Sequence, residues 1–283
     1  MQRKRVRSLL WGESVVPYKY GHYFVGLVLL VILGGFWATY FSTIGNVPLA
    51  FHVHAITSLM WLSLLIVQHV SIHRRANDFH KQMGKASFVL FPFLIFGFVM
   101  IINMSAQSYA AQESEFITYI GSAFGSGMLV AIAAYLTLYY LALKNRRNVK
   151  LHAGYMLATP VILFESPFGR LMDQYFPWLN FIRTDGLHGL LSTIAFSNAL
   201  MIVFVMVLYF RDRRHGAPWL VAAAFMTTQS VVMWFAPSIA IFDRMFAVYA
   251  TIPTALTLAA GLGAGALAGW LGGRAGSPPA KPA

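Results

Sequence analysis

The sequence predicts an all-α membrane protein, a polytopic bundle of eight transmembrane helices, and three observations support this. Of its 283 residues, 58% are hydrophobic and only 11% are charged, whereas a soluble domain carries about 25% charged residues. The apolar residues gather in runs of roughly 20, and a helix of about that length crosses a bilayer core. Backbone groups in lipid must be satisfied internally, and the alternation typical of a membrane barrel is absent, so these runs are expected to be helices.

Eight apolar runs are each expected to form one span. In chain order they cover residues 21–41, 50–72, 85–105, 117–143, 152–170, 188–210, 217–236 and 247–272. Pro237 and Pro253 interrupt the apolar pattern around the last two, because proline does not continue a helix without strain. The chain is therefore expected to form one transmembrane domain (21–272), with a basic interfacial segment before it (1–20) and a disordered cytoplasmic tail after it (273–283).

The basic residues predict the orientation of the bundle, because they gather at the N-terminus and in every second loop. The clusters are Arg3-Lys4-Arg5 with Arg7, Arg74-Arg75 with Lys81 and Lys85, Lys144 with Arg146-Arg147 and Lys150, and Arg211 with Arg213-Arg214. The positive-inside rule puts these loops and both termini in the cytoplasm, which fits an inner (plasma) membrane protein. The net charge of +12 is then topological. It argues against nucleic-acid binding, which needs basic residues on one folded face.

Nine histidines in this apolar chain predict a metal or haem centre, because several lie at the ends of predicted spans. A ring nitrogen near hydrocarbon needs a partner, and neutral imidazole is a common ligand of metals and of haem iron. His54 and His69 lie about 22 Å apart along one helix axis, toward opposite faces of the bilayer. The spacing predicts an outer layer of His54 with His188, and an inner layer of His152 with either His69 or His80.

Two histidine layers are what a transmembrane electron carrier needs. The leading prediction is a haem-b-type electron-transfer protein, a quinone- or metal-linked reductase component, in which His54, His80, His152 and His188 ligate iron or another metal. Arg147 and Arg170 are expected beside the haem, because a guanidinium pairs well with a propionate carboxylate. The ordinary alternative for any one histidine is an interfacial polar residue that hydrogen-bonds to water or headgroups. The chain has no cysteine, which excludes thiolate ligands and covalently attached c-type haem.

Two segments between residues 50 and 200 resemble an uncharacterised bacterial family. The matching residues are His80-x3-Gly84 after an arginine-rich loop, Arg147-x4-His152-x3-Met156, and Gly169-Arg170-Leu171. They are similar to the motifs "HRxLGR" and "RxHRxWM…RL" of a multi-pass domain-of-unknown-function family, with Lys81, Ala153 and Tyr155 as departures from its pattern. That family has been likened to two-haem transmembrane cytochromes b, including the ascorbate-dependent ones. The resemblance therefore implies a haem or quinone role.

Two other functions fit the sequence. Glu165 is the only carboxylate inside a predicted span. It is expected to pair with Arg170 or Arg183, and its alternative role is to accept a proton or to ligate a metal beside His54 and His188. A non-redox transporter or sensor would use a polar cavity around Glu165 and Arg170, together with Asn198 and Gln229. A structural or assembly partner without a cofactor is the third reading. The spacing of His69-x3-His73 also occurs in membrane di-iron enzymes, but those need more histidines on one side than this chain offers.

Three glycines in the last run lie four residues apart, at Gly261, Gly265 and Gly269. Small residues at this spacing let another helix approach closely. Packing within the chain is favoured over a contact with a second copy, and an oligomer through these glycines is the alternative.

Overall fold

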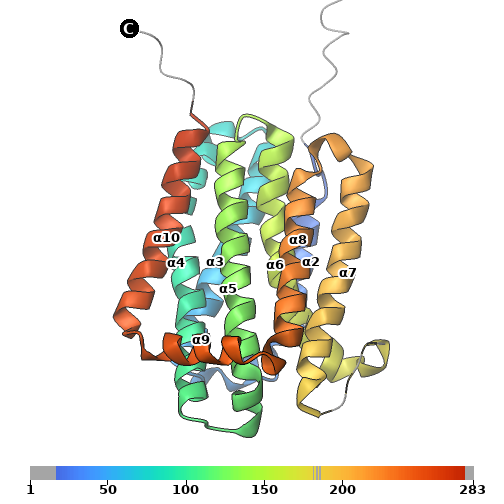
Figure 1. Cartoon of the computed structure of the whole chain (residues 1–283). Helices are drawn as coiled ribbons and strands as arrows, with labels where there is room; N and C mark the ends of the chain where they lie inside the picture. Colours follow the sequence, from blue (N-terminus) through green and yellow to red (C-terminus); the bar gives the residue numbers. More distant parts are fainter. Residues whose placement is uncertain (1–16, 181, 183, 185, 278–283) are drawn as a thin grey trace, which may run out of the picture.

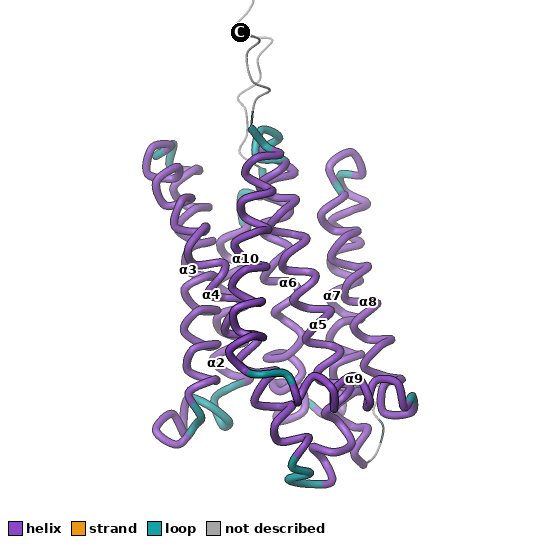
Figure 2. The backbone as a smooth tube through the Cα atoms, turned by 60° about the vertical axis from the view of Figure 1, so that its left-hand side comes forward, coloured by secondary structure: helices purple, strands orange, loops and turns teal. Residues whose placement is uncertain are grey.

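The computed structural model describes residues 17–180, 182, 184 and 186–277, and this part of the chain is helical with no strand (Figure 2). Its α-helices are α2 (Gly21–Gly35), α3 (Leu49–His73), α4 (Asn77–Ala110), α5 (Glu115–Lys144), α6 (Val149–Tyr175), α7 (Gly189–Arg211), α8 (Ala217–Phe235), α9 (Ala240–Thr251) and α10 (Thr254–Ala275). Short 3-10 turns are η1 (Phe41–Asn46), η2 (Pro177–Leu179), η3 (Gly186–His188), η4 (Arg213–His215) and η5 (Ala236–Ser238). Most of the predicted N-terminal segment (1–16) and the end of the predicted tail (278–283) lie outside the described residues.

Six of the described helices are long and apolar enough to cross a membrane, namely α3, α4, α5, α7 with η3, α8 and α10. The sequence predicts eight. The two others differ for separate reasons: α2 is apolar but only 15 residues long, and α6 is long enough but carries Glu165, Arg170 and Asp173 in its second half. The all-helical class is therefore confirmed for the described residues, with six candidate membrane spans, whereas eight spans and the cytoplasmic position of the termini stay predictions.

The last predicted span, 247–272, is broken in the structure. Helix α9 ends at Thr251, Ile252 is extended (φ −73°, ψ 131°), and α10 begins after Pro253. Proline fixes its own φ and disfavours helical backbone in the residue before it, so the chain turns here. Helix α9 lies across the end of the bundle, while α10 runs along it (Figure 1). Helix α10 continues to Ala275, which is inside the predicted disordered tail.

The glycine stripe of α10 packs within the chain. A Cβ on Gly261 would lie 2.8 Å from a methyl of Val99, and one on Gly265 would lie 2.7 Å from the Cα of Pro92. Gly269 is buried on the same face. Helix α4 therefore covers the stripe, which leaves it no exposed face for a second copy of the chain.

An aromatic layer joins α3, α4 and α5 in the middle of the bundle. Trp61 is 1% exposed, and its ring centroid lies 5.3 Å from that of Phe91 and 5.7 Å from that of Tyr139. The indole Nε1 of Trp61 donates to Thr159 Oγ1 of α6 (2.9 Å). A buried indole is stable when its N–H finds such a partner. Trp61 of this layer also lines the larger cavity of the bundle and lies at its end nearest the middle.

Candidate functional site

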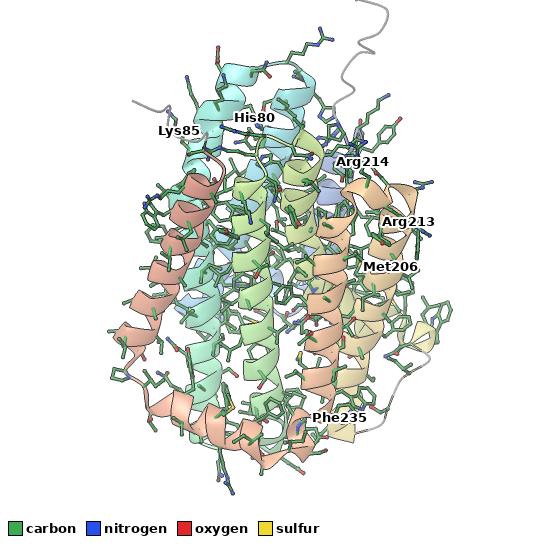
Figure 3. All side chains as sticks on the ribbon, turned by 45° about the horizontal axis from the view of Figure 1, so that its top comes forward. His80, Lys85, Met206, Arg213, Arg214 and Phe235 are labelled. Atoms are coloured by element: carbon green, nitrogen blue, oxygen red, sulfur yellow. The ribbon has the colours of Figure 1, made fainter. Side chains whose placement is uncertain are left out.

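A cavity of about 570 Å³ opens at the end of the bundle that carries the α3–α4 and α5–α6 loops. We call this the inner end, after the predicted orientation, and the opposite end the outer end. Trp61, Leu64 and Leu157 give the cavity apolar walls, and His80 and Lys85 mark its mouth on α4 (Figure 3). Small-molecule and cofactor sites are clefts of this kind, about 300–1,000 Å³ in volume and mostly apolar with a few polar groups.

The rim of the cavity is basic. Lys81 and Lys85 of α4 line it on one side, and Arg146 and Arg147 of the α5–α6 loop line it on the other. Lys81 lies 3.7 Å from Asp78 in an exposed pair, and Arg146 donates to the carbonyl of Gly273 (2.9 Å). Lys85 and Arg147 form no ion pair within the described part of the chain. The rim therefore offers positive charge to an anionic group that enters the cavity.

Three histidines of the cavity share one hydrogen-bonding arrangement. In each ring, Nδ1 donates to a backbone carbonyl: His73 to His69 (2.8 Å), His80 to Gln68 (3.2 Å) and His152 to Ala142 (2.8 Å). A carbonyl only accepts, so the proton lies on Nδ1 and a neutral ring keeps a lone pair on Nε2. Imidazoles that bind metals or haem are usually oriented in this way by a bond from the other nitrogen. The Nε2 of His73 is buried with no hydrogen-bond partner.

His69 is different, although it lines the same cavity. Its Nε2 donates to the carbonyl of Tyr18 (2.8 Å), and its Nδ1 lies 3.1 Å from Nδ1 of His22. The Tyr18 carbonyl can only accept a hydrogen bond, so the ring proton of neutral His69 lies on Nε2. Its Nδ1 then accepts a hydrogen bond from Nδ1 of His22. Both nitrogens of His69 are therefore occupied. Of the two alternatives for the inner layer, the geometry favours His80.

These residues fit a haem better than a bare metal ion. His80 on α4 and His152 on α6 each have an Nε2 with no hydrogen bond to the described residues, the walls are apolar, and the rim is cationic. A b-type haem needs these three things: axial ligands, a hydrophobic pocket and partners for its propionates. No group of three or more histidines and carboxylates that could hold a metal ion occurs among the described residues. This agrees with two separate histidine layers better than with a cluster of all four predicted ligands.

The outer histidines have separate surroundings. His54 on α3 packs against Phe98 (ring centroids 4.8 Å apart), and its Nδ1 is buried without a hydrogen-bond partner. His188, at the start of α7, has its Nδ1 2.9 Å from the hydroxyl of Tyr119 and its ring 4.5 Å from that of Trp234. No hydrogen bond or ring contact between His54 and His188 is found in the described chain. A haem between them stays a prediction.

Glu165 and Arg170 lie toward the outer end of α6, away from the cavity. Glu165 is 8% exposed. Arg170 donates to the carbonyl (3.1 Å) and the hydroxyl (2.7 Å) of Ser166, and its guanidinium lies 4.8 Å from the ring centre of Phe36. The predicted Glu165–Arg170 ion pair is not among those formed by the described residues, and Arg183, the other predicted partner, lies outside them. Arg170 is therefore no part of the inner site.

The sequence reasoning missed His73 as a cavity residue, and the i, i+4 spacing from His69 was the available signal. It had no signal for the contact of His69 with the Tyr18 carbonyl, which comes from tertiary packing. Comparison with known proteins finds no family model, no curated protein and no solved structure that matches this chain.

Proposed function

We propose that this chain is a haem-b-type electron-transfer protein whose inner cavity holds the haem between His80 and His152. One observation carries the proposal: imidazoles from two different helices line one cavity, each with Nδ1 bonded to a backbone carbonyl and with Nε2 making no bond to the part of the chain that the structure describes. Each ring is anchored to the neighbouring helix, His80 on α3 and His152 on α5. Ligands fixed in this way lose little conformational freedom when they bind.

The other cavity residues have supporting roles. Lys85 and Arg147 at the rim would pair with the propionates of a bound haem. Trp61, which is hydrogen-bonded to Thr159, forms the wall of the cavity nearest the middle of the bundle and would keep water from that side of the haem. A bound haem would supply one-electron chemistry, with a potential set by its axial ligands and by their hydrogen bonds. A quinone or a redox protein is the proposed partner.

The test is the absorption spectrum and the haem content of protein expressed with ample haem precursor. We expect a Soret band that sharpens on reduction, and its loss in His80→Ala and in His152→Ala. His215→Ala is the matched control, since its ring bonds to Asp212 in the α7–α8 loop at the same end of the bundle. His69→Ala tests the open alternative and is expected to keep the haem. A well-folded preparation without haem, or unchanged haem in both cavity variants, would refute the proposal.

A second candidate function is a non-redox transporter or sensor, and a specific observation favours it. Buried ionisable groups in a membrane are usually functional, and Glu165 is one. In the same half of the bundle, Asn198 donates to Gln229 (3.2 Å) and to Ser230 (3.0 Å), while its Oδ1 is buried without a partner. This reading predicts that Glu165→Gln abolishes function in cells, whereas His80→Ala does not.

A further inference from the structure

A second cavity, of about 450 Å³, lies under α9 at the outer end of the bundle. We refer to it as the α9 notch. Its walls come from α4, α5 and α9 and are mostly apolar, with Ile102, Leu129, Ile241, Met245, Val248 and Ile252 among the lining residues. One charged side chain, that of Arg244, lines it as well.

The α9 notch faces the surface that lipid would cover. Leu129 is 49% exposed, although it lies within the candidate span α5, and Met245 and Val248 are 57% and 64% exposed. Ile241, Met245 and Val248 follow the spacing of one helical face. An amphipathic helix that lies across the end of a membrane bundle places such a face among lipid chains.

The notch extends from α9 into the apolar layer. Phe246 of α9 packs against Tyr109, with ring centroids 5.2 Å apart. Ile102 lies two turns before Tyr109 on α4, which is about 10 Å along the helix toward the middle of the membrane. A ligand in this space therefore has one end level with α9 and the other among the spanning helices.

The notch carries the positive charge of Arg244. Asp243, the neighbour of Arg244 in sequence, forms no salt bridge with a cation of the described residues. Arg244 itself belongs to no ion pair among the described residues. A lone cation beside an apolar slot complements a molecule that has an anionic head and a hydrocarbon tail.

We propose that the α9 notch binds an anionic phospholipid, with the phosphate against Arg244 and an acyl chain along Ile102 and Leu129. The site lies at the opposite end of the bundle from the haem cavity, and it does not depend on the proposed redox function. A lipid bound here would hold α9 against α4 and α5, because its acyl chain would fill the space between these helices.

Retention of defined lipids tests the proposal. The full chain is purified in detergent with equal amounts of phosphatidylglycerol and phosphatidylcholine, passed over a sizing column, and its retained lipids are counted by mass spectrometry. We expect phosphatidylglycerol to be enriched in the wild type and reduced about five-fold in Arg244→Gln, the loss expected for one cation at an anionic lipid. Arg244→Lys keeps the charge and is expected to keep most of the enrichment.

The controls separate the notch from general lipid contact. Arg211→Gln removes an exposed arginine at the inner end and should leave retention unchanged. Leu129→Trp fills the notch and should lower phosphatidylglycerol retention, whereas Leu200→Trp, on an exposed part of α7, should not. Equal retention of the two lipids by the wild type, or equal losses in Arg244→Gln and Arg211→Gln, would overturn the proposal.

Discussion

The inner and outer ends of the bundle both contain histidines, but they use them differently. At the inner end, His80 and His152 fix one ring nitrogen on the backbone and leave the other facing a cavity. At the outer end, His188 bonds to a tyrosine hydroxyl, and His54 packs against a phenylalanine ring. Position at a helix end is therefore not enough to identify a ligand. What distinguishes His80 and His152 is that both line one cavity and that a backbone carbonyl fixes the Nδ1 proton of each ring.

The largest expected effect is the loss of haem when the inner histidines are replaced but not when the outer ones are. The double variant His80→Ala/His152→Ala should lose its haem, whereas His54→Phe/His188→Phe should keep it, because the inner rings line one cavity, while neither that cavity nor the α9 notch is lined by His54 or His188. The haem-to-protein ratio, measured as the pyridine haemochrome, checks this. An equal loss from the outer pair would show that both layers bind haem, as the sequence predicts.

A smaller effect is expected at the basic rim. Arg147→Gln should speed the transfer of haem to an apoprotein acceptor by about five-fold, because an exposed ion pair contributes up to about 1 kcal/mol. Arg213→Gln serves as the control, since its guanidinium lies over Phe210, outside the cavity. Identical transfer rates for the two variants would remove the rim from the site.

The hydrogen bond between Tyr119 and His188 is expected to contribute to the stability of the fold and not to haem binding. Tyr119→Phe removes the hydroxyl 2.9 Å from Nδ1 of His188 and should cost about 1 kcal/mol, the usual net contribution of a hydrogen bond. A thermal melt in detergent measures the change, with the exposed Tyr175→Phe for comparison. A loss of haem in Tyr119→Phe would instead give the outer end a ligand role.

The smallest effect is expected at His54. Its Nδ1 is buried and unpartnered, so replacing the ring by an apolar one of similar shape removes a desolvation cost. His54→Phe should change the free energy of unfolding by less than about 1 kcal/mol, or raise it. A large destabilisation would mean that this nitrogen has a partner, such as an ordered water or a cofactor.

The sequence predicts the helical class well because hydropathy is a local property. The predicted runs 117–143 and 217–236 agree with α5 and α8 to within a few residues. Hydropathy predicts less at polar helix ends, so α4 begins at Asn77 and includes His80, which was expected before the span. Hydropathy also predicted one span over 247–272, where the structure has the end of α9 and the whole of α10 up to residue 272, although Pro253 indicated a break between them.

The candidate site was predictable in its residue types and not in its bonds. The spacing put His80 and His152 beside basic loops, and both line the cavity. It could not decide between His69 and His80, because that depends on the carbonyl of Tyr18, far away in the chain. Ring-nitrogen partners come from how helices settle against each other, and no local pattern encodes them.

The packing of α10 on α4 has a consequence for biosynthesis. Helix α10 packs on α4, and Asn103 of α4 donates to Thr257 of α10 (2.8 Å). Ribosomes complete α4 long before α10, so the flank of α4 around Pro92 enters the bilayer bare and stays so until the final helix arrives. Nascent chains halted before Thr254 would therefore lack the helix that covers Pro92 and Asn103 of α4.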